Sequence, residues 1–551
     1  MKPEGNMLTV VVTNSISDIY PQTADFTFYG GLYRDVNFIE VNEAHFDLLK
    51  DGTAGVFVTP HCSGNTRFDL FPVGGEAIAV VIKDAEGNVA ARGGAPAVNH
   101  TDLLISVKEP HKWHGMEDPY CYTAVAKLLV GEEVVDEVEV TFGYRSFHVD
   151  SNTGFWLNGK NVPLHGVSRH QDRLDKGWAI SKEDHEEAYE NTISQMIELV
   201  AQNYNHPSIF FWGISNEILI GADNEPLRKN LRDLNDLAKS MDPSRMTTIA
   251  QVSSTPMDSE HNYITDVVSY NHYFGWYGGD VSNNGPWFDA YHALNPDIPL
   301  GVSEYGVENI IKWHSATPMN HDYTEEYANY YHHEMLKTFA TRPYLWSTHV
   351  WNMFNFAADA RDEGGVIGRN NKGLVTYDRK TKKDAFYIYK AYWTTEPMVY
   401  VAGRRFADRA PEERNITVYT NCDEVTLVVN GVEVATQAAL DHAVVFENVA
   451  LNNGANTITA KAGDVEDTIT LNGVAEHNEE YTLPDLAANE ECVKCIKGWF
   501  MAMGNLTMAS MVGAIAGMMG DAKITMLSSM MEGTTQKDFA KLNRLLNKIQ
   551  K

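Results

Sequence analysis

The middle of the chain alternates between short apolar runs and segments with helical spacing. Between these runs, residues 190–204 place Met196 and Val200 on one helical face. This alternation is typical of βα units around a parallel sheet. A closed barrel of this type needs eight strands, so the pattern predicts an incomplete (β/α)8-type barrel over residues 151–396. Its six expected strands end in polar or aromatic residues and lie at 164–170, 210–217, 246–252, 267–273, 299–304 and 344–352.

Strand patterns flank this central region on both sides. Residues 46–150 and 397–476 carry short alternating strands with frequent turn residues, which predicts two immunoglobulin-like β-sandwiches. Residues 1–45 alternate around Leu8–Thr13, but so few strands indicate only the end of a further β-domain. The Asn-Gly pairs at 158–159, 430–431 and 472–473 favour the left-handed conformation of tight hairpin turns.

The final segment, residues 477–551, predicts a Met-rich helical tail. It holds nine of the 20 methionines and has no charge between Lys497 and Asp521. The length of this uncharged stretch would permit a membrane span, and Gly513–Gly517 has the spacing of packed membrane helices. Its glycines and polar residues instead favour helices that pack against another protein surface. We therefore expect no membrane span.

Composition narrows the class of protein. With 551 residues and 44% apolar side chains, the chain can bury several cores. A formal net charge of −30 disfavours nucleic acid and anionic membranes as partners. The five cysteines are scattered, which argues against a disulfide framework. Since the first residues also lack the apolar core of a signal peptide, the sequence predicts a cytoplasmic protein.

Two glutamates carry the candidate chemistry. Glu217 ends the apolar run Phe210–Asn216, and Glu304 ends the run Pro299–Ser303. A buried parallel strand that ends in one carboxylate delivers that side chain to a pocket at its carboxyl end. Two carboxyl groups in one pocket can break a glycosidic bond, one as proton donor and the other as nucleophile. The alternative is that both glutamates form ordinary ion pairs at strand ends.

The motifs around these residues resemble those of the family 2 glycoside hydrolases, and most closely the bacterial β-galactosidases of that family. Trp113–Tyr120 and Phe142–Phe147 are similar to the immunoglobulin-like domain of the family. Gly166–His170 resembles its first barrel strand, and Trp212–Glu217 and Ser303–Gly306 resemble its two catalytic strands. The similarity spans residues 25 to 475, which is most of the chain.

The resemblance implies a retaining hydrolase of terminal β-D-galactosides that works by double displacement. Glu217 would be the general acid/base and Glu304 the nucleophile. Asn216 would bind the 2-hydroxyl of the sugar, and Tyr273 would donate a hydrogen bond to the nucleophile. A small-molecule carbohydrate is the expected partner, and a homo-oligomer remains open.

Three further residues are implied at the sugar pocket. Trp351 would form a platform for the sugar, although a core tryptophan at a strand end is an equal alternative. His170 would lie at the floor of the pocket, although a lone histidine is more often an ordinary core residue. Asp25 matches a family position that reaches the active site from the first domain.

The sequence departs from the family pattern in two places that affect the site. Most of the amino-terminal jelly-roll domain has no counterpart, so residues 1–45 resemble its remnant. Near residues 187–190 the chain joins two places that a long stretch separates in the family. That stretch carries the second and third barrel strands, an Arg-x-x-His substrate contact and an acidic magnesium ligand. Mg²⁺ and Na⁺ are common in the family, but the metal site of this chain stays unknown.

Two alternatives to a β-galactosidase remain open. Asn370-Asn371-Lys372 matches the Asn-x-Lys motif with which β-glucuronidases of the same family hold the substrate carboxylate, and the Asn271–Tyr277 segment resembles their corresponding strand. A lysine suits a uronate, but the motif is only three residues long. The second alternative is an inactive carbohydrate-binding remnant, because an incomplete barrel could misplace the catalytic pair.

Overall fold

The computed structural model folds as two compact units, residues 1–308 with 331–382 and residues 309–330 with 383–551. The structure describes residues 7–12, 25–32, 36–170, 172–175, 192–220, 223–362, 365–410, 414–473, 482–503, 507–511, 522–524, 526, 538–539, 542 and 545–546.

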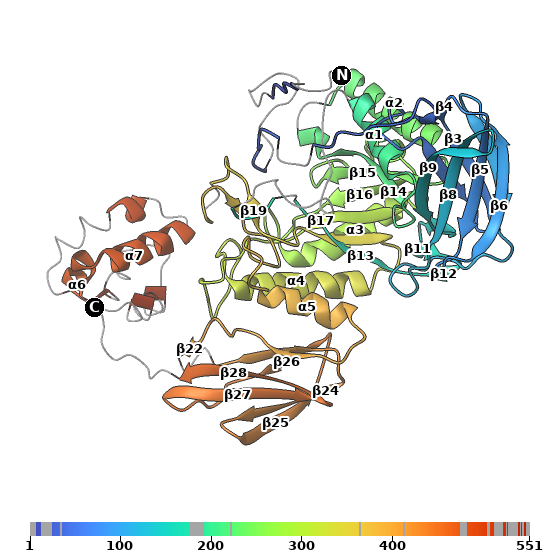
Figure 1. Cartoon of the computed structure of the whole chain (residues 1–551). Helices are drawn as coiled ribbons and strands as arrows, with labels where there is room; N and C mark the ends of the chain where they lie inside the picture. Colours follow the sequence, from blue (N-terminus) through green and yellow to red (C-terminus); the bar gives the residue numbers. More distant parts are fainter. Residues whose placement is uncertain are drawn as a thin grey trace. The chain divides into compact units, whose positions relative to one another are not determined.

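A β-sandwich begins the first unit. One sheet has the order β6 (Val89–Pro96), β5 (Ala77–Lys83), β8 (Tyr122–Val130) and β9 (Glu133–Phe142). The facing sheet has the order β2 (Val56–Pro60), β3 (Asn65–Leu70) and β7 (Thr101–Ser106), and β1 (His45–Phe46) pairs with β4 (Pro72–Val73). Alternate residues of β5, Ile78, Val80 and Ile82, are at most 2% exposed and join one core. The expected sandwich is confirmed, and Figure 1 shows it in blue.

A hairpin connects this sandwich to the parallel sheet. Its strands are β10 (Phe147–Asp150), β11 (Gly154–Leu157) and β12 (Lys160–Asn161). Asn158 and Gly159 have φ angles of 50° and 81°, so they form the tight turn that their sequence predicted.

Six parallel strands form the curled sheet of the first unit. Their order is β13 (Leu164–Val167), β18 (Ser347–Val350), β17 (Leu300–Tyr305), β16 (Val267–Asn271), β15 (Met246–Val252) and β14 (Phe211–Asn216). All five neighbouring pairs are parallel. The six expected strands are therefore confirmed, and β13 and β14 form the two edges of a half-barrel.

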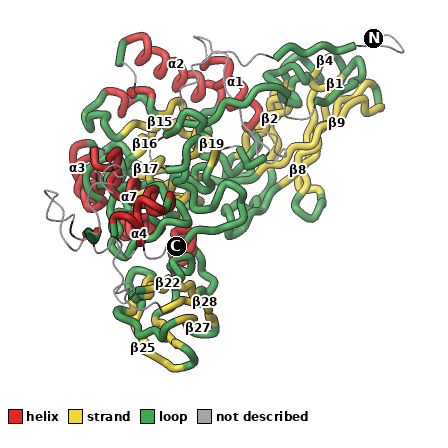
Figure 2. Tube along the Cα trace, turned by 90° about the vertical axis from the view of Figure 1, so that its left-hand side faces the viewer, coloured by secondary structure: helices red, strands yellow, loops and turns green. Residues whose placement is uncertain are grey.

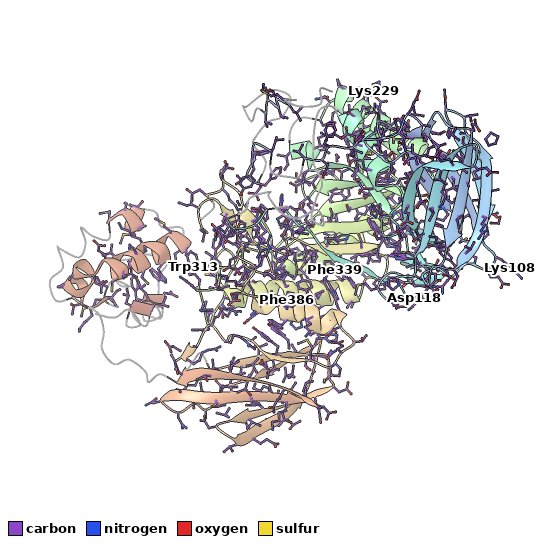
Figure 3. All side chains as sticks on the ribbon, in the orientation of Figure 1. Lys108, Asp118, Lys229, Trp313, Phe339 and Phe386 are labelled. Atoms are coloured by element: carbon purple, nitrogen blue, oxygen red, sulfur yellow. The ribbon has the colours of Figure 1, made fainter. Side chains whose placement is uncertain are left out.

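Helices cover the strands of the half-barrel (Figures 1 and 2). The main helices are α1 (Thr192–Asn203), α2 (Glu225–Met241), α3 (Asn284–Leu294) and α4 (Glu325–Ala340). Short 3-10 turns η2 (Ile218–Ile220), η3 (Glu260–Tyr263) and η4 (Val281–Asn283), and the strand pair β19 (Phe356–Ala357) and β20 (Arg369–Asn370), lie in the connections. Side chains fill the space between these elements, and Phe339, labelled in Figure 3, lies 4.9 Å from Tyr305 between ring centroids. Apolar spacing in α1 buries Met196 and Val200, as predicted.

The second unit contains another β-sandwich and the helical tail. One sheet has three strands in the order β21 (Val399–Val401), β23 (Ile416–Thr420) and β26 (Ala443–Phe446). The other sheet has five strands in the order β22 (Asp408–Arg409), β28 (Val465–Gly473), β27 (Gly454–Ala462), β24 (Glu424–Val429) and β25 (Val432–Ala438). The helices are α5 (Asp384–Trp393), α6 (Leu483–Ala488) and α7 (Glu490–Ala502). Cys492, Ile496 and Phe500 of α7 belong to a small apolar core of the tail. No helix among the described residues is long and apolar enough to cross a membrane.

Two local predictions were wrong, and one lies outside the described residues. Asn472-Gly473 is not a turn but the end of β28, where a Cβ on Gly473 would lie 2.2 Å from the carbonyl oxygen of Asn452. That close backbone approach, rather than a turn, requires glycine. Residues 7–12 form no strand, and their side chains are exposed, with Val11 at 89%. The junction at 187–190 lies outside the described residues.

Candidate active site

The carboxyl ends of the half-barrel strands open into a cavity of about 990 Å³. Both candidate glutamates line it, together with most of the other predicted site residues. These residues are Asp25, His170, Asn216, Glu217, Tyr273, Glu304, Trp351 and Lys372. The structure therefore brings together predicted site residues from five of the six strand ends, from the amino-terminal segment and from the segment after β20, and Val252 at the end of β15, the sixth strand, also lines the cavity.

Glu217 follows directly after β14. Its φ angle of 50° is left-handed, and its backbone N–H donates a 2.9 Å hydrogen bond to the carbonyl of Ala250. This turn ends the strand and leaves the half-buried carboxyl group at the cavity. A non-glycine residue in this conformation is uncommon and is found mostly where the surrounding structure holds it.

Glu304 is part of β17, which β16 and β15 separate from β14 in the sheet. The Tyr273 hydroxyl donates a 2.7 Å hydrogen bond to Glu304 Oε2, which is the contact predicted for this pair. Two residues later, a Cβ on Gly306 would lie 2.1 Å from the carbonyl oxygen of Trp351. The glycine thus allows the chain after Glu304 to pass close to Trp351.

Asn271, the last residue of β16, was not among the predicted site residues. Its side chain is fully buried, donates a 2.9 Å hydrogen bond to Asn216 Oδ1 and accepts a 2.7 Å hydrogen bond from Ser303 Oγ. Asn271 also lowers the pKa of both candidate glutamates through hydrogen bonding, against the larger effect of burial. Its position two residues before Tyr273, on the same face of the strand, is the signal that could have identified it.

The electrostatics of the two carboxyl groups are coupled. Burial raises the pKa of Glu217, and hydrogen bonding from Asn271 and the charge of Lys372 oppose that rise. Burial also raises the pKa of Glu304; the Tyr273 hydrogen bond and Lys372 oppose this rise, and the charge of Glu217 adds to it. Like charges in one buried site disfavour double ionisation, so the pair retains a proton more readily than separate carboxyl groups would.

An aromatic cluster forms another side of the cavity. The His170 ring stacks on Phe356 with centroids 4.0 Å apart and meets Trp351 edge-on at 5.0 Å. Burial lowers the pKa of His170 to about 4, with Asp25 acting in the opposite direction, so the imidazole is neutral at pH 7. Trp351 and His170 therefore present mainly apolar ring surface, which suits contact with the C–H face of a sugar.

The chain after β18 contributes a charged wall to the cavity, which includes Arg361 and Lys372. Lys372 is 1% exposed, and its ammonium donates a 2.7 Å hydrogen bond to the Tyr277 hydroxyl. Asn370 does not line the cavity: it is fully buried, and its Nδ2 donates a 2.8 Å hydrogen bond to Asp25 Oδ2. Of the Asn-x-Lys motif, Lys372 thus faces the ligand space, whereas Asn370 holds Asp25.

The donor set for a metal ion is weak. No group of three or more His, Cys, Asp or Glu side chains in the described part of the chain is placed to hold one. The described residues therefore do not supply the carboxylate-rich oxygen set that Mg²⁺ prefers, and no chemical step below uses Mg²⁺ or Na⁺.

Comparison with protein families agrees with this architecture. The family described as "Glycosyl hydrolases family 2, TIM barrel domain" matches residues 179–396, and "Glycosyl hydrolases family 2" matches residues 61–145. A domain of unknown function matches residues 412–466.

Several known proteins are similar over most of the chain. A β-glucuronidase of Bacteroides fragilis is 35% identical over 523 residues, which cover 80% of this chain and 74% of that protein. The crystal structure of an FMN-binding β-glucuronidase from Facaelibacterium prausnitzii L2-6 has 46% sequence identity and a TM-score of 0.80, covering 84% of this chain and 80% of that one. A β-galactosidase of Bacteroides ovatus is 22% identical over 466 residues, covering 64% of this chain and 53% of that protein.

These similarities confirm the family inferred from the motifs, and they favour the β-glucuronidase alternative over the β-galactosidase. The chain belongs to glycosyl hydrolase family 2 and is a glycosidase of the kind that hydrolyses O-glycosyl bonds.

Proposed function

We propose that this chain is a retaining β-glucuronidase in which Glu217 is the general acid/base and Glu304 the nucleophile. The observation that carries the choice of sugar is Lys372, a buried ammonium in the same cavity as both glutamates. A buried cation gains most from a ligand that brings a negative charge. The carboxylate of a glucuronide supplies that charge, whereas the hydroxymethyl group of a galactoside does not.

In the first step, the Glu304 carboxylate attacks the anomeric carbon of the sugar. The bond from that carbon to the leaving oxygen breaks, and Glu217 gives its proton to the oxygen. Because the Tyr273 hydroxyl donates to Glu304, it favours the ionised form of this carboxyl group, which the role of nucleophile requires. The product is a covalent glycosyl ester on Glu304.

In the second step, water attacks the same carbon from the face that the aglycone has left. Glu217, now ionised, takes a proton from the water, and the bond to Glu304 breaks. Two displacements restore the original configuration. Retention predicts that the two carboxyl groups stand about 5 to 5.5 Å apart.

Other groups are proposed to hold the sugar during these steps. Asn216, fixed by its hydrogen bond from Asn271, would contact the 2-hydroxyl, where a contact that strengthens in the transition state raises kcat. Trp351 and His170 would support the ring of the sugar from the aromatic side of the cavity.

Tyr273→Phe tests the proposed role of the hydroxyl on Glu304. Without this donor the pKa of Glu304 rises further. When the pH is lowered, Glu304 is therefore protonated, and the nucleophile inactivated, at a higher pH than in the wild type. We expect the acidic limb of the kcat/KM profile to move up by about one pH unit and kcat to fall about 100-fold. An unchanged acidic limb would contradict this role.

The experiment for the function compares two substrates of one aglycone. Purified chain is assayed with 4-nitrophenyl β-D-glucuronide and 4-nitrophenyl β-D-galactoside, and kcat/KM is measured for each. We expect the glucuronide to be the better substrate by at least about 100-fold, the size of one buried charge contact. A higher value for the galactoside would reject the choice of sugar. No turnover of either substrate by well-folded protein would favour the carbohydrate-binding alternative.

A further inference from the structure

The wall around Lys372 contains a second buried cation and a buried carboxylate. Arg361 is 7% exposed, and Glu308 and Lys372 are each 1% exposed. Arg361 and Lys372 line the cavity, whereas Glu308 lies behind them, four residues after Glu304. A buried carboxylate is stable only with cations or hydrogen-bond donors beside it, so the choice of its partner matters.

Arg361 is the main partner of Glu308. Its Nε donates a 2.7 Å hydrogen bond to Glu308 Oε1, and its Nη2 lies 2.5 Å from the same oxygen. Other guanidinium contacts go to Asp25 Oδ2 at 2.6 Å and to the Tyr277 hydroxyl at 3.0 Å. Two N–H groups on one oxygen fix the position of the Glu308 carboxylate more firmly than a single contact would.

Lys372 is farther from the same carboxylate. Its Nζ lies 3.8 Å from Glu308 Oε1, beyond hydrogen-bonding distance, and donates instead to Tyr277 at 2.7 Å. Both cations thus approach one carboxylate oxygen, and Arg361 makes the shorter contacts, including a hydrogen bond. Attraction between opposite charges grows as they approach each other. Without Arg361, the Glu308 carboxylate would therefore move toward the Lys372 ammonium and form a direct hydrogen bond with it.

Such a contact would compete with the substrate. A lysine that already forms a direct ion pair with a carboxylate of the protein binds the carboxylate of a sugar less strongly. The negative charge of Glu308 would also repel the carboxylate of the sugar. We propose that Arg361 is a positioning residue that holds Glu308 away from Lys372 and so keeps the Lys372 ammonium available to the carboxylate of the sugar. This inference rests on the proposed β-glucuronidase function.

The competition predicts that one substitution rescues another. We expect Arg361→Gln to raise KM for 4-nitrophenyl β-D-glucuronide by roughly 10- to 100-fold, with a smaller change in kcat. Adding Glu308→Gln to that variant removes the competing charge and should lower KM again by at least about threefold. If Arg361 were needed only for folding or for general packing, the second substitution would add a further loss.

The measurement is a double-mutant cycle of KM over the wild type, the two single variants and the double variant. Arg342→Gln is a matched control, because Arg342 also binds a carboxylate, that of Asp289, but lies outside the cavity lining. Its KM should match the wild type. If Arg361→Gln does not fold, Arg361→Lys replaces it in the cycle, since a single ammonium cannot reproduce the two contacts to Glu308.

The outcomes separate this inference from the function on which it rests. A wild type that prefers the galactoside rejects the proposed function, and the inference falls with it. The inference alone is overturned by a different pair of results. In that case the wild type prefers the glucuronide, but the KM of the double variant is less than threefold below that of the single Arg361 variant, or is above it. Recovery of KM in the double variant supports it.

Discussion

Glu304→Gln is expected to abolish turnover, lowering kcat on 4-nitrophenyl β-D-glucuronide by on the order of 10⁴-fold or more. The amide keeps the size of the side chain and can still accept the hydrogen bond from Tyr273, but it cannot form the glycosyl ester. Steady-state kinetics measure the loss, and circular dichroism verifies that the variant is folded. A residual rate within about tenfold of the wild type would show that another group is the nucleophile.

Glu217→Gln is the matched comparison, because it removes the proposed proton donor and leaves the nucleophile intact. The loss should depend on the leaving group: small for an activated phenol that departs without protonation, and large for a poor leaving group. An external anion such as azide should accelerate the variant by replacing the water that Glu217 no longer activates. Equal losses for all leaving groups, with no response to azide, would contradict the acid/base role.

Lys372→Met is expected to remove most of the preference for the glucuronide. Methionine retains much of the length of the side chain but removes the charge, so kcat/KM for the glucuronide should fall by about 10²- to 10³-fold. The galactoside makes no contact with this charge, so its kcat/KM should change less than about threefold. The ratio of the two kcat/KM values, measured on the same preparation, reports the effect independently of the active fraction.

Lys380→Met is the control for this substitution. Lys380 is an exposed lysine in the same part of the chain and is absent from the cavity lining. Its loss should leave the ratio of the two substrates unchanged. A similar loss for both substrates in Lys372→Met would instead assign Lys372 to the packing of the wall.

Local pattern predicted the framework well because each strand must bury its own apolar side chains. The runs around residues 246–252 and 267–273 contain β15 and β16, and all five residues of β16 are buried. The pattern failed at Gly473 because the need for glycine there comes from the approach of Asn452, which the local sequence does not reveal. The domain limits and the cytoplasmic location stay predictions.

The sequence pattern identified site residues only where a catalytic type of side chain stands at the end of an apolar strand. Glu217 and Glu304 could be identified this way, whereas Asp25 was proposed from family resemblance alone and reaches the cavity through its contacts with Arg361 and Asn370. Arg361 could not be predicted as a site residue from the sequence, because its role depends on partners from separate connecting segments. Contacts of this kind form only after the strands have assembled.

The choice of sugar depended on burial, which a three-residue motif cannot show. In the sequence, Lys372 could equally be an exposed lysine in a loop, and the wider resemblance favoured a galactoside. In the structure, its ammonium is buried beside the candidate nucleophile and the faces of Tyr273 and Tyr277, at 5.6 and 4.8 Å from their ring centroids. A buried cation in a cavity with two catalytic carboxyl groups is a feature that a uronate uses and a neutral sugar does not.

The central claim is that Glu304, Glu217 and Lys372 act together on one glucuronide ring, and covalent trapping tests it most directly. The chain is incubated with a 2-deoxy-2-fluoro-β-glucuronosyl fluoride or with its galactosyl equivalent, and the labelled peptide is located by mass spectrometry. The account predicts fast labelling by the glucuronosyl probe, on Glu304, and slow labelling by the galactosyl probe. Attachment to any other residue, or faster labelling by the galactosyl probe, would contradict it.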